Sequence, residues 1–189
     1  MERNITALFL IAFLGCGQEN NMPVDKKNPA NTGKELRLRA LTTSADILGF
    51  IPEKDYPEVY GVITDWDLGE HTASILAMRD GTASLYTTST FGIIGGQGHD
   101  TVRKAAQECV KIAGPYYPQS TPVSNYPYPK QGKVNFFLLT YSGVRLCIGD
   151  EDGINQGRDQ TRALFEAAQN VLTALRLITD LKTQEGAPK

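Results

Sequence analysis

The chain has few of the residues that build metal and redox centres. Its 189 residues include three cysteines and two histidines, and no two cysteines have C-x-x-C spacing. Without a C-x-x-C pair, and with only His71 and His99 to supply imidazole, a zinc site is not expected. The formal net charge is −2, and no stripe of Lys and Arg offers a surface for nucleic acid. We therefore expect no metal, no cofactor and no nucleic-acid partner.

Sequence motifs of catalysis are also missing, because the chain has no G-x-S-x-G turn. Residue types used in nucleophilic catalysis do occur: His99 would be the base, Ser89 or Thr90 the nucleophile, and Asp65 the orienting acid. Their spacing does not require that they meet, and a lone histidine at a helix start is more often a surface or capping residue. We expect no catalytic residue and a protein that acts by binding.

Long apolar runs are absent except at the start, where residues 5–14 follow Arg3 and lead to Gly15 and Cys16. The run is shorter than the ~20 residues that span a bilayer. This arrangement resembles a bacterial lipoprotein signal peptide. The resemblance implies that residues 1–15 are removed, that Cys16 carries the lipid, and that the protein lies at the cell envelope, on the outer membrane in a Gram-negative cell. The alternative is a cytosolic N-terminal helix and a cytoplasmic protein.

The rest of the chain is long enough for one domain and too short for two. Residues 16–35 are rich in Asn, Gly, Pro and Lys and predict a disordered tether. A single globular domain is expected over residues 36–182, and a polar tail over residues 183–189.

Five β-prone segments are separated by turn signals. Asp80-Gly81 predicts a hairpin with a type I′ turn, in which both central residues have positive φ, and Ser142-Gly143 predicts a second hairpin. The predicted strands are residues 59–66, 72–79, 82–88, 133–140 and 144–149.

Three helices are predicted around these strands. The first covers residues 42–50, and the second runs from Asp100, as its cap, to Ala113 before Gly114-Pro115. Asp159 is expected to cap a long third helix. The apolar stripe of this helix is Leu164, Ala168, Val171, Leu175 and Ile178.

This element order predicts an α+β fold with an antiparallel five-stranded sheet flanked by helices. The order is similar to the roadblock and profilin-like architecture, and the roadblock likeness implies a cytoplasmic dimer that regulates small GTPases. The run GVITDW…DGTASLYTTSTFGIIGGQGH also resembles a bacterial domain family to which no activity is attached.

The glycine-rich turn before the second helix is one candidate site. Backbone N–H groups at Gly95, Gly96 and Gly98, with His99, could hold a phosphate or carboxylate at the helix N-terminus. Neither the G-x-G-x-x-G nor the Walker pattern is present, and Asp100 would compete for the same donors. The favoured alternative is a tight strand-to-helix crossing that needs glycine.

An acidic turn and a pair of thiols are weaker candidates. Asp150, Asp152 and Asn155 supply oxygens suited to Ca²⁺, but the EF-hand order of ligands is absent, which favours a solvated acidic turn. Cys109 and Cys147 lie among apolar neighbours. Buried free thiols are favoured over a disulfide, although the sequence leaves their pairing open.

Residues 115–132 contain five prolines and four tyrosines, a composition that predicts an irregular segment. Its tyrosines offer contact area at low entropy cost, so the segment is a candidate surface for a protein partner or a second copy. Equally, it can pack across the domain's own surface. These tyrosines are Tyr116, Tyr117, Tyr126 and Tyr128.

Taken together, these features predict a lipid-anchored binding or scaffold domain of the cell envelope that is not catalytic. Its partners would be the membrane, through the N-terminal lipid, and a protein or a second copy. One alternative is a small enzyme or a nucleotide- or anion-binding regulator that uses the loop Gly92–Gly98. The other is the cytoplasmic roadblock-like dimer.

Overall fold

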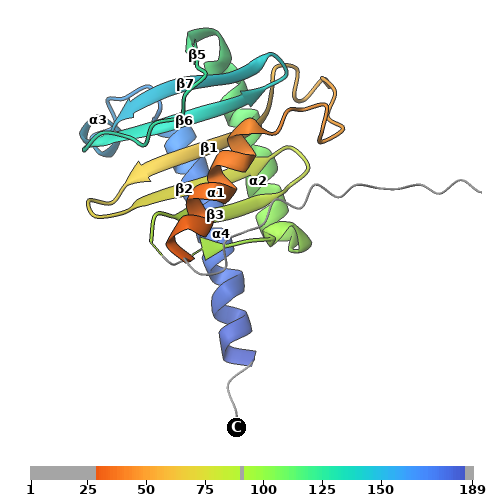
Figure 1. The fold of residues 1–189 in the computed structure, drawn as a ribbon, viewed down its shortest axis with the longest axis vertical. Coiled ribbons are helices and arrows are strands. Elements are labelled where there is room, and N and C mark those ends of the chain that lie inside the picture. Colours follow the sequence, from red (N-terminus) through yellow and green to blue (C-terminus); the bar gives the residue numbers. More distant parts are fainter. Residues whose placement is uncertain (1–28, 90–91, 186–189) are drawn as a thin grey trace, which may run out of the picture.

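A computed structural model describes residues 29–89 and 92–185 of the chain (Figure 1). The fold is α+β, with one antiparallel sheet flanked by helices. The strand order is β4-β3-β2-β1-β6-β7-β5. The strands are β1 (Val59–Asp67), β2 (Thr72–Met78), β3 (Ala83–Thr87), β4 (Gly92–Ile93), β5 (Thr121–Pro122), β6 (Lys133–Thr140) and β7 (Gly143–Asp150).

The sheet has seven strands rather than the five predicted. The five long strands coincide with the predicted segments to within about a residue, because each carries a continuous β-prone pattern. The two additional strands, β4 and β5, are two residues long and contain a glycine or a proline. Such short segments show no alternation, and both residue types are depleted in strands, so the sequence carries no signal for them.

The β2–β3 hairpin forms where expected, but its turn is different. Gly81 has φ +88°, whereas Asp80 has negative φ, which excludes a type I′ turn. Gly81 N–H donates to Met78 O at 2.9 Å, and Met78 N–H donates to Thr82 O at 2.9 Å. This is a three-residue loop that ends in a left-handed glycine. The Asp80 carboxylate accepts the Thr82 N–H at 2.8 Å and holds this conformation.

The two faces of the sheet bury separate apolar cores. Helices α2 (Asp100–Ala113) and α4 (Arg162–Glu185) cover the face that carries Val62 and Phe136. Helix α1 (Pro29–Thr42) covers the opposite face, which carries Ile63 and Phe137, and stands in front of the sheet in Figure 1. The sheet is therefore the middle of three layers.

Helix α1 shows that two predictions are wrong. Residues 29–35, expected in the tether, form its first turns, and residues 42–50, expected as a helix, lie at or beyond its last residue. The apolar pattern misled because α1 turns the charged Arg37 toward the sheet and leaves Leu38 half exposed. The predicted signal peptide and the rest of the tether lie outside the described residues.

Helices α2 and α4 match their predictions better. Asp100 is the first helical residue of α2 rather than its cap, and its carboxylate accepts from Arg103. Asp159 lies just before α4, and its carboxylate accepts the Thr161 N–H at 2.7 Å. All five residues of the predicted α4 stripe are buried. Helix α4 continues to Glu185, into the predicted polar tail. Among the described helices, none is long and apolar enough to cross a membrane.

Segment 115–132 is more regular than predicted. It contributes most of a 3₁₀ helix, η2 (Gly114–Gln119), as well as β5. Pro115 stands in the first turn of η2, where proline loses no hydrogen bond, whereas Pro118 lies inside this short helix. A second short 3₁₀ helix, η1 (Gly96–Gly98), precedes α2, and the short helix α3 (Glu151–Asn155) follows β7.

The only tryptophan of the chain joins three elements. Trp66, on β1, donates from Nε1 to Glu151 Oε1 on α3 at 2.9 Å. Its ring meets Phe165 of α4 edge to face, with 5.4 Å between the ring centres. The indole thus ties the end of β1 to both helices that follow β7.

Candidate functional site

A hollow of about 400 Å³ lies at the β5–β7 edge of the sheet. Segment 115–132, strand β7 and the turn before α4 supply its walls. None of its lining residues carries a charge. The lining residues are Tyr116, Gln119, Thr121, Val123, Leu146, Cys147, Ile148, Gln160 and Thr161.

The hollow lies where strand β7 is incompletely covered. Strand β5 pairs with β7 at Leu146 and Arg145, and the Val123 N–H donates to Val144 O at 3.0 Å. At the end of β7, the Asp159 carboxylate accepts the Asp150 N–H at 2.9 Å. Between these points, the outer side of Ile148 has no strand neighbour in the described chain, and 59% of this residue is exposed. The edge is therefore open over a short stretch beside an apolar wall.

Hydrogen bonds fix the walls of this hollow. The Tyr116 hydroxyl donates to Gln160 O at 2.9 Å, which joins η2 to the turn before α4. Arg145 Nε donates to Ser120 Oγ at 2.8 Å, and its guanidinium lies 4.7 Å from the ring centre of Tyr117. The hollow is thus largely formed before any ligand enters, which lowers the entropy cost of binding.

The four predicted tyrosines pack against the domain's own surface. Tyr116 is buried, and Tyr117 contacts Arg145. The Tyr126 ring meets Phe137 edge to face at 5.9 Å, and the Arg37 guanidinium lies 4.3 Å from the ring centre of Tyr128. Of the four, Tyr116 lines the hollow at the β5–β7 edge.

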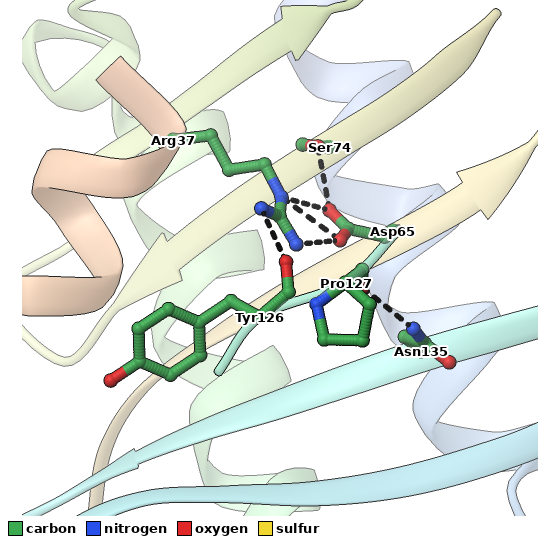
Figure 2. Close-up of polar contacts among 6 residues, drawn as sticks. All are labelled: Arg37, Asp65, Ser74, Tyr126, Pro127 and Asn135. Carbon is green, nitrogen blue, oxygen red and sulfur yellow. Dashed lines mark hydrogen bonds and ion pairs between the residues drawn. The ribbon is translucent and has the colours of Figure 1, made fainter. Parts of the chain in front are cut away.

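A buried polar network holds the same segment on the α1 face (Figure 2). Arg37 Nε donates to the two carboxylate oxygens of Asp65 at 3.0 and 2.9 Å, and the Ser74 hydroxyl donates to Asp65 at 2.6 Å. Arg37 also donates from Nη1 to Tyr126 O at 3.1 Å. Asn135 Nδ2 donates to Pro127 O at 3.1 Å.

The network resolves the role of Asp65. Burial raises the pKa of its carboxyl, and the hydrogen bonds and charge of Arg37 act in the opposite direction. Asp65 lies on the α1 face, whereas His99 precedes α2 on the other face. Asp65 therefore does not orient His99 as a catalytic base. The Ser89 hydroxyl is 2.8 Å from the Thr87 hydroxyl, and Thr90 lies outside the described residues. No sequence signal links Arg37 to Asp65, because they are 28 positions apart.

A second, smaller hollow of about 260 Å³ lies between the end of α1 and the β6–β7 turn. Its lining includes Tyr60, Tyr126 and Tyr141. The Tyr60 hydroxyl donates to Thr43 O at 3.1 Å, and burial raises the pKa of Tyr60 to about 12. The Tyr60 hydroxyl is therefore protonated, and its proton is already donated to Thr43 O.

The glycine-rich turn lines neither hollow. A Cβ atom on Gly96 would lie 2.6 Å from Leu175 Cδ2 and 2.7 Å from Val102 Cγ1, whereas a Cβ on Gly98 would meet open space. Gly95 has φ +82°. The close approach at Gly96 is the packing expected of a tight strand-to-helix crossing, and His99 makes no side-chain capping bond to α2.

The predicted acidic turn begins a helix instead. Asp150 caps α3 by accepting the Gly153 N–H at 2.8 Å, and it also accepts from Lys133 Nζ at 2.6 Å. These two donors lower the pKa of Asp150. Asp152 and Asn155 are exposed on α3. In the part of the chain that the structure describes, no three His, Cys, Asp or Glu residues gather as a metal site.

Cys109 and Cys147 are free and buried, as favoured from their apolar neighbours. Burial raises the pKa of Cys109 to about 12. Burial also raises the pKa of Cys147, and the charge of Arg145 acts against this increase. Cys147 lines the hollow at the β5–β7 edge, and Cys109 does not. The sequence does not predict this hollow, because it forms only where segment 115–132 pairs with β7 in the folded chain.

No family model matches this chain, and neither a curated protein nor a solved structure matches it.

Proposed function

We propose that this chain is a lipid-anchored binding domain of the cell envelope, without catalytic activity, that binds an uncharged extended peptide at the β5–β7 edge. The observation that carries the proposal is the short open stretch of β7 at Ile148, beside a hollow without charged lining. An open strand edge offers backbone N–H and C=O groups to an added strand.

The chemistry of the hollow supports this class of partner. Val123, Leu146 and Ile148 supply apolar contacts for a side chain of the added strand. Gln119, Thr121 and Gln160 supply uncharged donors and acceptors. A charged side chain would lose hydration here without gaining an ionic partner, which disfavours it.

The anchor and the binding site need separate tests. Metabolic labelling with a palmitate analogue is expected to tag the wild-type chain and to leave Cys16→Ser untagged. The wild type should then sediment with membranes, and Cys16→Ser should not. Recovery of both forms in the soluble cytoplasm would contradict the anchor.

Binding can be tested with uncharged peptides selected from a display library against the purified chain. Ile148→Arg is expected to weaken their binding at least about tenfold, since a buried unpaired charge costs several kcal/mol. Ile47→Arg is the matched control, because Ile47 is also exposed and lies outside the hollow. Equal affinity of both variants for the selected peptides would contradict the site.

A further inference from the structure

The backbone groups of β7 point alternately toward β6 and toward the outer edge of the sheet. Val144 O accepts the Val123 N–H at 3.0 Å on the outer side of the strand. The Asp150 N–H also points outward, to the Asp159 carboxylate at 2.9 Å. Because the register between β6 and β7 has no shift, the even-numbered residues of β7 direct their N–H and C=O groups outward, and the odd-numbered residues bond to β6.

Ile148 belongs to the outward-facing set. Its neighbours in this set are both engaged across the edge, since Leu146 pairs with Thr121 of β5 and the Asp150 N–H meets a carboxylate. Neither the N–H nor the C=O of Ile148 has a hydrogen-bond partner among the described residues. The edge therefore leaves one donor and one acceptor free, and a single residue carries both.

The structure on either side of Ile148 limits what can be added here. On one side Thr121 lies opposite Leu146, and the preceding chain forms η2 instead of continuing along β7. On the other side the Asp159 carboxylate occupies the place where the carbonyl oxygen of an added strand would lie. The two blocked positions are four residues apart, or about 14 Å. About three residues fit between them, and only the central one directs both backbone groups at β7.

The side chain of that central residue would meet an apolar surface. Val144 and Leu146 pack against the core under α1, so Ile148 points to the same face by strand alternation. Directly opposite residues of an antiparallel pair hold their side chains on one face, about 5 Å apart. Ile148 is exposed and lines the hollow. An apolar, β-branched side chain is therefore the best match for this position.

We propose that the site recognises a single extended apolar residue of a peptide, through a reciprocal pair of hydrogen bonds with Ile148. The peptide N–H donates to Ile148 O, and the peptide C=O accepts the Ile148 N–H. This inference rests on the proposed function, because it concerns the same edge and the same class of partner. The recognised unit is one residue with its two flanking peptide groups, and the peptide leaves the edge on both sides of it.

An N-methyl scan measures how many peptide N–H groups meet β7. The probe is an uncharged seven-residue peptide from the display selection, acetylated and amidated, and made again with one N-methyl group at each position in turn. We expect one position to weaken binding at least about tenfold and the others to change it less than about threefold, because one N–H is used. A strand added along the edge would lose affinity at alternate positions.

Two variants at position 148 test the donor of the protein. Ile148→Pro removes the N–H and keeps the bonds to β6, because this N–H points away from β6. Ile148→Ala is the matched control, since it also lacks the isoleucine side chain but keeps the N–H. We expect Ile148→Pro to bind the peptide at least about tenfold more weakly than Ile148→Ala.

Hydrogen exchange on the wild-type chain gives a readout that does not depend on the folding of a variant. The Ile148 amide should exchange fast in the free protein and several-fold more slowly with the peptide bound. The amides of Leu146 and Asp150 should be protected in both states, because they already have partners. Protection of the Ile148 amide in the free protein would contradict the open pair.

The outcomes separate this inference from the proposed function. Sensitivity to N-methylation at two or more alternate positions, or at none, while Ile148→Arg still weakens binding, overturns the single-residue contact alone. Equal binding by folded Ile148→Pro and Ile148→Ala does the same. Selected peptides that bind Ile148→Arg and Ile47→Arg equally well overturn the site and, with it, this inference.

Discussion

Arg37 and Asp65 form an ion pair that is removed from water on both sides. Their side chains are 5% and 0% exposed, and the pair joins α1 to strand β1 (Figure 2). Two buried charges of this kind stabilise a fold only as long as both are present. This pair therefore fixes α1 to the sheet alongside the apolar contacts of Ala40 and Leu41, although its two residues are far apart in the sequence.

Removal of one partner is expected to be costly. Arg37→Met leaves Asp65 buried without its countercharge and should lower the free energy of unfolding by about 3–5 kcal/mol. The double variant Arg37→Met, Asp65→Leu should recover most of this loss, because no charge remains buried. Urea unfolding followed by circular dichroism measures both. Additive losses in the double variant would show that the pair is not coupled.

The glycine-rich turn offers a comparison of two glycines, Gly96 and Gly98, that are separated by one residue. Gly96→Ala is expected to lower stability by about 1–3 kcal/mol, because its Cβ would overlap Leu175 and Val102. Gly98→Ala meets no atom within 4 Å and should change stability by less than about 0.5 kcal/mol. Thermal unfolding with and without phosphate provides the measurement. A protection by phosphate that Gly98→Ala abolishes would instead indicate an anion site.

A buried hydroxyl marks a position that can be improved. Thr64 Oγ1 is buried without a hydrogen-bond partner in the described structure. Thr64→Val keeps the shape of the side chain and should raise the free energy of unfolding by about 1 kcal/mol. Thr140→Val is the control, since Thr140 Oγ1 donates to Gly143 O at 2.6 Å and its loss should destabilise. Destabilisation by both changes would mean that Thr64 has a partner, such as a buried water.

The two thiols should differ in reactivity. With a pKa of about 12, Cys109 is a thiolate in only about one molecule in ten thousand at pH 8. Cys147 lines the hollow and is expected to react with a thiol reagent first, although slowly. A peptide bound at the β5–β7 edge should slow Cys147 further and leave Cys109 unchanged. Mass spectrometry of the labelled peptides distinguishes the two. Faster labelling of Cys109 in the folded chain would contradict the described packing.

Acid should weaken the turn before α4. Burial acts to raise the pKa of Asp159, but the Asp150 N–H and the Thr161 hydroxyl and N–H outweigh it, so the pKa is below its ordinary value. A depressed folded-state pKa stabilises the fold above the unfolded pKa of about 3.9, and this contribution disappears as pH falls through the folded value. Asp159→Asn should therefore unfold more easily at pH 7 and lose less stability between pH 5 and about pH 2 than the wild type.

The matched control for this pH comparison is Asp152→Asn, which changes an exposed carboxylate on α3. Urea midpoints across the acid range should follow the wild type in this variant. An acid limb in Asp159→Asn as steep as that of the wild type would contradict the role of Asp159.

The predictable parts of this fold are those that local patterns encode. The buried stripe of α4 and the five long strands repeat their apolar residues over several turns or pleats, so periodicity finds them. The apolar pattern does not predict helix α1, because the charged Arg37 faces the sheet and its ion-pair partner Asp65 is 28 residues away. Local patterns do not predict the hollow either, because β5 is two residues long and pairs with β7 through a tertiary contact.

The position of Trp66 has a practical consequence for spectroscopy. As the only indole, placed against Glu151 and Phe165, it makes intrinsic fluorescence a reporter of the contact between β1, α3 and α4. Helix α1 covers the opposite face and contacts no tryptophan. Detachment of α1 would leave the emission spectrum nearly unchanged while helical ellipticity falls. A mismatch between these two signals would thus identify a partly unfolded form that has released helix α1.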